Sequence, residues 1–531
     1  MSVHIPRLEQ YSSITNIPYH VLVDVMRYAY HLDGGPNAVS KFSRTCKYFH
    51  FEGVKVLLGE KVVFHIEKHL ASFCTFMLAD RKRFSMLRGR LVICVGSISG
   101  PTTALLIDCL RYITDLPSLH LMSATTFLRS QPLLIAAFAG LTCLTDLYLL
   151  VEDQGINSPK AAAAGPAHHY AILLRTMRSP LRSVRLNIVV ANILKRFTYM
   201  RSLDPVWLLS PHSKTLQSIC MENHFTTDAS TTVHIFPYVT SLTLSDMHRI
   251  QHIRPFIASF PTLRSLRFCG QAWRARIRPH ESLKLSAARP SSRLPLTSRL
   301  QNKHDQATFG TWTMLEEVVG PTLELYKMGL ICRIPRVHIV LLGGVPADEV
   351  TMVQEIVQDA CPTTVRVMMK MEDIIRVLEP TFLPPHAVLY LTCLELKLNM
   401  DALPFCPKDY FERVVRATEL LPLVSLTLEI RCEMSPRFYP EDDGCVPPRF
   451  ASSEWPSFCR TLDKMEEEDV PGHLRDIATR ISTLRRVTIA WGRCLAQVPH
   501  RVVTLDLDRV PQIIDRPENP REDSEWWHDA F

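Results

Sequence analysis

Two short stretches of the sequence carry residue types that could bind a phosphate or a zinc ion. The first is Gly96-Ser97-Ile98-Ser99-Gly100, which follows a strand-like run from Leu91 to Val95. A nucleotide phosphate loop needs four residues between its glycines and a lysine after the second. This stretch has three residues and then Pro101. The spacing therefore argues against a phosphate loop.

The second stretch places His65 and His69 on one side of a possible helix, the spacing of a zinc-binding helix. A catalytic zinc helix carries its glutamate directly after the first histidine, whereas Glu67 comes one position later and no third ligand is indicated. We interpret the pair as surface or partly buried histidines. Nucleophile-elbow and dinucleotide-binding glycine motifs are also absent from strand-to-helix contexts. We therefore expect a protein that is not an enzyme, with no catalytic residue, metal or cofactor.

A repeated pattern dominates the chain outside these stretches. Residues Phe236–Leu244 and Phe260–Phe268 share the frame F-P-x-[VL]-x-S-L-x-[LF] and start 24 residues apart. Looser copies end in the same apolar-x-apolar step, which is typical of a short strand with one buried face. They lie near 141–149, 180–186, 216–221, 334–339, 391–396, 423–428 and 484–489. Helical patterns separate them, for example at 353–361 and 410–420. A strand plus a helix in each repeat indicates a stacked solenoid.

The strand frames resemble leucine-rich repeats, read as L-x-x-L-x-L, over about residues 88–508. The resemblance implies an irregular solenoid of parallel strands and helices. The alternative is another α/β domain with leucine-rich parallel strands. The residue between the last two apolar positions of each frame should lie on the solvated strand face. The candidate target-binding residues are therefore Tyr148, Arg185, Thr243, Arg267, His338, Thr427 and Thr488.

The first fifty residues follow a different, helical pattern. Pro18 suits the start of a helix, and the apolar residues Val21, Leu22, Val25 and Met26 follow at helical spacing. The Gly34-Gly35-Pro36 break ends this helix, and Val39, Phe42, Cys46 and Phe49 continue the apolar pattern. So few residues cannot bury a sufficient core alone, so the segment either docks on the rest of the chain or presents apolar surface to a partner.

This segment resembles an F-box over about residues 12–58, with Ile17 in place of the commoner leucine and Phe49 in place of tryptophan. The resemblance implies binding to a Skp-type adaptor and, through it, to a cullin. The residues carried over as adaptor contacts are Ile17, Pro18, Val21, Leu22, Val25, Met26, Phe42, Cys46 and Phe49. The alternative is a helical hairpin that only caps the domain behind it.

The composition of the chain fits a folded intracellular protein. The chain has 531 residues, which is too long for one ordinary domain. Hydrophobic residues make up 47% of it and charged residues 21%, as in a folded protein. Fifteen cysteines without any C-x-x-C spacing favour buried thiols over disulfides or zinc. No secretory signal or membrane-spanning stretch is apparent. We expect a cytoplasmic or nuclear protein without membrane association.

The net charge of +7 comes from one segment. Residues 271–303 hold eight basic residues and one acid, so the rest of the chain sums to zero. The segment is rich in proline and serine and is interpreted as a solvated insertion. It could bind an acidic partner, but its one aromatic residue, Trp273, makes nucleic-acid binding less favoured.

These observations predict an α/β protein with an N-terminal all-α module. The predicted parts are an F-box-like module at 12–58, a helical linker at 59–87, a leucine-rich-repeat-like solenoid at 88–508 with insertions near 270–310 and 431–472, and a polar tail at 509–531. The first hypothesis is the substrate receptor of an SCF-type ubiquitin ligase that holds an unidentified target protein on its repeats. The second is a repeat scaffold without ligase assembly, and a third, less favoured, is an acidic-partner or nucleic-acid binder acting through residues 271–303.

Overall fold

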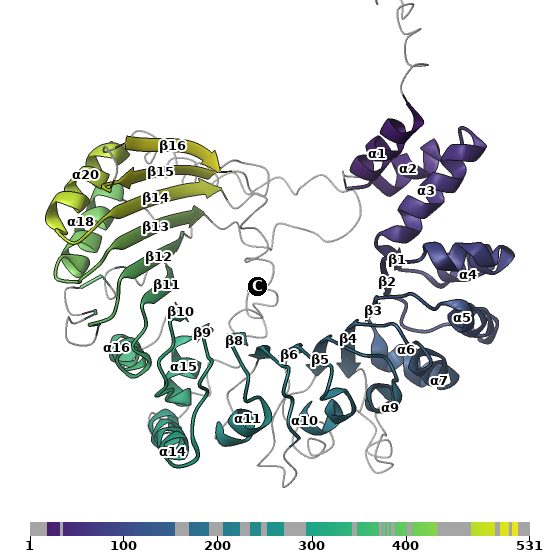
Figure 1. The fold of residues 1–531 in the computed structure, drawn as a ribbon, viewed down its shortest axis with the longest axis horizontal. Helices are drawn as coiled ribbons and strands as arrows, with labels where there is room; N and C mark the ends of the chain where they lie inside the picture. The colour runs from purple at the N-terminus through teal and green to yellow at the C-terminus, as the bar shows by residue number, and fades with distance from the viewer. Residues whose placement is uncertain are drawn as a thin grey trace, which may run out of the picture. The chain divides into compact units, whose positions relative to one another are not determined.

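Strands and helices alternate along most of the chain in the computed structural model (Figure 1). The structure describes residues 18–31, 35–153, 169–190, 205–222, 234–245, 252–269, 294–341, 348–370, 374, 378–379, 382–383, 388–400, 406–432, 469–493, 500–508 and 512–518. The chain divides into two compact units, Met1–Phe197 and Thr198–Phe531. Each unit combines strands with helices, so the predicted α/β class with mostly parallel strands is confirmed.

The first unit begins with the helices α1 Tyr19–Tyr30, α2 Gly35–Phe42 and α3 Lys47–Gly59. Pro18 precedes α1 and its carbonyl accepts the first helical hydrogen bonds. Met26, Val39, Phe49 and Val56 form a buried cluster between the helices. A glycine is required at the start of α2, because a Cβ at Gly35 would lie 2.2 Å from the Tyr30 carbonyl oxygen. The predicted N-terminal helical segment is confirmed.

Five parallel strands follow in sequence order in the first unit. They are β1 Val62–Phe64, β2 Arg90–Ile93, β3 Ser118–Leu121, β4 Asp146–Asp153 and β5 Ser183–Val190. The helical elements between them are α4 Glu67–Ala79, η2 Arg81–Met86, α5 Gly100–Tyr112, α6 Ala124–Ser130, α7 Leu133–Ala139 and α9 His169–Thr176. Leu91, Leu119 and Leu147 pair in register and are almost fully buried. One side of each strand therefore belongs to the core.

The second unit continues the parallel pairing from β6 to β14, and β14 to β16 pair antiparallel. The strands are β6 Ser218–Glu222, β7 Ser241–Ser245, β8 Ser265–Cys269, β9 Glu317–Pro321, β10 Arg336–Val340, β11 Thr364–Lys370, β12 Cys393–Met400, β13 Ser425–Cys432, β14 Arg486–Arg493, β15 His500–Asp506 and β16 Gln512–Glu518. The helical elements are α10 Pro205–Leu208, η5 Ser210–His212, α11 Arg254–Ser259, α14 Leu294–Phe309, α15 Thr322–Met328, α16 Asp348–Ala360, α18 Pro407–Thr418 and α20 Val470–Arg480.

The two matching sequence frames occupy equivalent places in the second unit. Leu242 of β7 pairs with Leu266 of β8, and each side chain is 1% exposed. The phenylalanines that open the frames, Phe236 and Phe260, are buried with ring centroids 5.2 Å apart. The alternation between core side chains and side chains on the other strand face confirms the predicted register.

The structure corrects three predicted boundaries. The expected linker at 59–87 contains β1, which pairs with β2, so this segment belongs to the sheet. Part of the expected tail, residues 512–518, forms β16 against β15. Residues 294–303, expected as a solvated insertion, belong to the helix α14. Residues 270–293 and 433–468, the main parts of the two predicted insertions, lie outside the described residues.

The helix α14 buries a polar face and exposes an apolar one. Asn302 and Gln306 are almost fully buried, whereas Leu296 and Leu300 are about half exposed, at 49% and 58%. Asn302 accepts a hydrogen bond from the Ile253 N–H at 2.9 Å. Gln306 donates to the carbonyl oxygens at the end of α15, so the side chains of α14 bind backbone groups that the α15 C-terminus leaves open.

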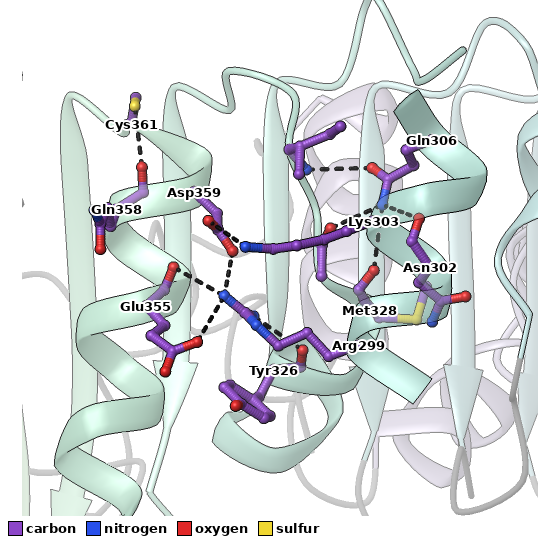
Figure 2. A network of polar contacts seen from close by, with 12 residues as sticks. Arg299, Asn302, Lys303, Gln306, Tyr326, Met328, Glu355, Gln358, Asp359 and Cys361 are labelled. Atoms are coloured by element: carbon purple, nitrogen blue, oxygen red, sulfur yellow. Dashed lines mark hydrogen bonds and ion pairs between the residues drawn. The ribbon is translucent and has the colours of Figure 1, made fainter. Parts of the chain in front are cut away.

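Figure 2 shows Arg299 of α14 among carbonyl and carboxylate oxygens of α15 and α16. Its side chain is 3% exposed, and its guanidinium forms ion pairs with Asp359 and with Glu355 (3.1 Å) and donates to the Tyr326 carbonyl at 3.1 Å. Lys303 binds the second oxygen of Asp359 at 2.7 Å. Two of the eight basic residues that were assigned to a solvated loop therefore hold neighbouring repeats together.

Candidate functional site

The helix α1 has two apolar faces. Val23 and Met26 point into the module and are 5% and 1% exposed. Val21, Val25 and Tyr28, spaced by four and three residues, form a second stripe that is 38%, 47% and 61% exposed. We call these three residues the outward stripe. An amphipathic helix that only docks on its own domain needs one apolar face, so this second face is available for a partner.

Aromatic side chains form a second exposed apolar group on the same module. The Tyr19 and Tyr48 rings are 62% and 45% exposed, with centroids 5.2 Å apart. Both rings pack on the buried Phe49, which also contacts Phe42 with centroids 6.0 Å apart. Rings supported in this way offer contact area at a low cost in conformational entropy.

The structure separates the nine predicted adaptor contacts into three groups. Pro18, Val21, Val25, Phe42 and Cys46 are exposed, and Leu22 is half-buried against the module core. Met26 and Phe49 are buried in the module core, which leaves little of either side chain for a partner to contact. Ile17 lies outside the described residues. The exposed residues that were missed are Tyr19, Tyr28, Tyr48 and Phe51. The spacing of Tyr28 from Val21 and Val25 could have identified that residue.

The predicted target-binding residues share one register on the strand face opposite the buried leucines, here called the inner face. In the first unit, Tyr148 pairs with Arg185. In the second unit, the register passes through Thr243, Arg267, Val319, His338, Arg366, Glu395, Thr427 and Thr488. The structure therefore aligns the predicted residues of each unit in one row. His338 is only 6% exposed, so little of its side chain is accessible to a target.

Charges on the inner face of the second unit are paired between neighbouring strands. Arg267 lies 3.4 Å from Glu317, and Arg366 pairs with Glu395. One step further along the strands, Lys397 and Glu429 form an ion pair at 2.5 Å with little exposure of either side chain. Cross-strand pairs of opposite charge stabilise a sheet modestly, and here they also neutralise much of the surface charge.

The imidazole of His338 lies within this ladder of charges. Burial is the main reason that its pKa is lowered to about 3, and the nearby cations Arg366, Arg267, Lys397 and Arg336 lower it further. A carboxylate oxygen of Glu317 lies 3.9 Å from Nε2 and would favour protonation, but burial and the surrounding cations outweigh it. His338 is therefore neutral near pH 7.

Acid should destabilise the second unit through His338. An unfolded histidine titrates near pH 6.5, so between about pH 6.5 and 3 the unfolded chain binds the extra proton. This contribution to stability is complete above about pH 6.5 and is lost as the pH falls toward 3. When the pH is lowered from 7 to 5, the free energy of unfolding should fall less for the His338→Gln variant than for the wild type. The difference between the two losses should be at most about 2 kcal/mol. Urea denaturation followed by the fluorescence of buried Trp312 measures this, and equal losses would contradict the assignment.

The inner face of the first unit has a different character. The His120 and Tyr148 rings lie side by side, with centroids 5.2 Å apart, and the Arg185 guanidinium lies over the Tyr148 ring at 5.5 Å. The pKa of His120 is lowered to about 4, first by burial and then by Arg90, Lys61 and Arg185. These three cations therefore lie close enough to act on a single imidazole.

No protein-family model and no curated protein matches the sequence. Among the described residues, none of the helices combines the length and apolar character needed to cross a membrane. The described side chains also include no group of three or more histidine, cysteine, aspartate or glutamate residues that could hold a metal ion. Among the described residues, the exposed apolar side chains of the N-terminal helices and the polar rows on the inner strand faces are candidate partner surfaces.

Proposed function

We propose that the chain is the target-binding subunit of an SCF-type cullin-RING ubiquitin ligase. In this proposal, α1 to α3 form an F-box that binds a Skp-type adaptor, and the strand and helix units behind it are leucine-rich repeats that hold a target protein. The observation that carries the proposal is the outward stripe of Val21, Val25 and Tyr28. Because Met26, Val39, Phe49 and Val56 already fill the module core, the stripe is not needed to hold the module together.

A subunit of this kind contributes proximity and performs no chemistry itself. The adaptor would link the N-terminal module to a cullin, and the repeats would hold the target near the charged conjugating enzyme. Tethering raises the effective concentration of target lysines at that enzyme. Two properties of the chain support this division of labour: an exposed apolar surface on the N-terminal helices, and long rows of polar side chains on the inner strand faces.

The test is a double substitution in the outward stripe, Val21→Asp with Val25→Asp. Both side chains are exposed, so the fold should persist, whereas two carboxylates in an apolar interface would lose their hydration. We expect binding to a Skp-type adaptor to weaken at least about tenfold, or about 1.4 kcal/mol, in co-purification and titration calorimetry.

Val424→Asp is the matched control, because Val424 is 43% exposed and lies outside the N-terminal module. It should bind the adaptor as tightly as the wild type. Equal adaptor binding by the stripe variant and the control would contradict the proposal. Far-UV circular dichroism of all three proteins shows whether the stripe variant keeps its helices.

A second candidate function is a repeat scaffold in which the helices only cap the sheet. The observation that favours it is the hydrogen bond from the Tyr30 hydroxyl of α1 to the Lys61 carbonyl beside β1, at 2.7 Å. This bond ties α1 to the backbone beside β1, the edge strand of the sheet. On this alternative, the stripe variant would unfold the first unit, and the wild type would not bind an adaptor.

A further inference from the structure

We propose that the inner face of the first unit binds an acidic segment of a partner protein, through Lys61, Arg90 and Arg185 beside Tyr148. We call these four residues the basic patch. The binding itself does not depend on ligase assembly, whereas the identification of this partner with the ligase target rests on the proposed function.

The strand register brings the patch together. Arg90 of β2 and Tyr148 of β4 lie on the same side of the sheet, since they alternate with the buried Leu91 and Leu147. Arg185 of β5 is directly opposite Tyr148. Lys61 immediately precedes β1 and lies opposite Arg90, because Val62 pairs with Leu91. The patch therefore extends across five neighbouring strands.

Two cations of the patch, Lys61 and Arg90, lack the cross-strand pairing found in the second unit. Among the described residues, neither Lys61 nor Arg90 forms an ion pair, although the two cations are opposite each other on neighbouring strands. Like charges at opposite positions destabilise a sheet. In the register that contains Arg90, the one carboxylate on strands β2 to β5 is that of Asp146, which accepts a hydrogen bond from Thr145. The patch is therefore a region of positive potential that an anionic partner would stabilise.

The dimensions of the patch indicate the kind of partner. Four strand spacings of about 4.8 Å separate β1 from β5, which gives about 19 Å between Lys61 and Arg185 along the sheet. An extended peptide of about six residues spans that distance at about 3.3 Å per residue. The exposed side chains of Lys61, Arg90 and Arg185 can reach carboxylates along it, and Tyr148 offers a ring beside them.

An acidic peptide fits this surface better than a nucleic acid does. Single strands bind where successive bases can stack on aromatic rings. The patch has one tyrosine, and that ring already contacts His120 and Arg185. A row of carboxylates needs only the cations and an accessible sheet face.

The test measures fluorescence anisotropy of a labelled peptide of about six glutamates, matched to the span above, with the full-length chain. A glutamine peptide of equal length is the uncharged control. We expect the glutamate peptide to bind, the glutamine peptide not to bind, and added salt to weaken the complex. Arg90→Glu with Arg185→Glu should weaken binding at least tenfold, about 1.4 kcal/mol. Arg90→Gln with Arg185→Gln should cause a smaller loss.

The matched control is Arg111→Glu with Arg129→Glu, two exposed arginines on helices α5 and α6 of the same unit. It changes the net charge equally and should leave peptide binding unchanged. The proposal would be overturned if the wild type did not bind the glutamate peptide. It would also be overturned if the Arg90 and Arg185 reversal bound the peptide as tightly as the control reversal. Tighter binding of a single-stranded oligonucleotide that the Arg90 and Arg185 reversal abolishes would assign the patch to nucleic acid instead. Adaptor binding is measured separately, so loss of one interaction with retention of the other identifies which proposal fails.

Discussion

Replacing Arg299 with methionine should lower the free energy of unfolding of the second unit by about 3–5 kcal/mol. The guanidinium is buried and contacts Asp359, Glu355 and the Tyr326 carbonyl, so its removal leaves the carboxylate of Asp359 with Lys303 alone. A partly buried charge that loses its main partner keeps its desolvation cost without the compensating attraction. Urea denaturation followed by tryptophan fluorescence measures the loss.

Arg485→Met is the matched control for this prediction. Arg485 pairs with Asp508 at 3.5 Å, but both side chains are more than 60% exposed, and such pairs contribute at most about 1 kcal/mol. Adding Asp359→Leu to Arg299→Met should restore part of the lost stability, because it removes the uncompensated carboxylate. Equal effects of the Arg299 and Arg485 substitutions would show that α14 is dispensable for holding the repeats together.

The second large effect is expected at the repeat core. Leu266→Ala should cost about 2–5 kcal/mol, since the side chain is 1% exposed and its removal leaves a cavity between strands and helices. The equivalent Leu242→Ala should cost a similar amount. Thr243→Ala, next to Leu242 on the half-buried inner face, should cost less than about 1 kcal/mol. A larger loss at Thr243 than at Leu242 in thermal and urea denaturation would contradict the strand register.

The strand frames could be predicted because their leucines are buried on one side only. Frames such as Leu394–Leu396 and Leu426–Leu428 become β12 and β13, in register with each other. The sequence pattern does not predict the strand β9, because Gly320 and Pro321 stand at its end where the other frames have an apolar and a polar residue. The glycine has a packing reason: a Cβ at Gly320 would lie 2.9 Å from the Cβ of Phe268 on the neighbouring strand.

The helix α14 could not be found from hydrophobic patterning, because its pattern is inverted. Its buried side carries Arg299, Asn302 and Gln306, and its exposed side carries Leu296 and Leu300. A prediction that places apolar residues in the core would orient such a helix with the wrong face inward, or would predict a loop. Only the positions of the α15 carbonyls and of Asp359 explain why polar residues are buried there.

The N-terminal contacts were predicted only in part for a similar reason. Both faces of α1 are apolar, and residue type alone does not decide between the stripe of Val21 and Val25 and the buried Met26. Packing against Val39 and Val56 from the other two helices decides it. On the strands, by contrast, the period of two predicts which face carries Tyr148 and Arg185. It does not predict that His338 is buried or that cations lie close to its imidazole.

Direct titration of the full-length wild-type chain with a purified Skp-type adaptor tests the central claim most directly. Size-exclusion chromatography with light scattering should show one complex with the mass of one adaptor plus the 60.6 kDa chain. Calorimetry should give a dissociation constant below about 1 μM, as expected for an apolar helix face buried in a stable interface. Separate elution of the two proteins, with no heat of binding, would contradict the assignment of α1 to α3 as an F-box.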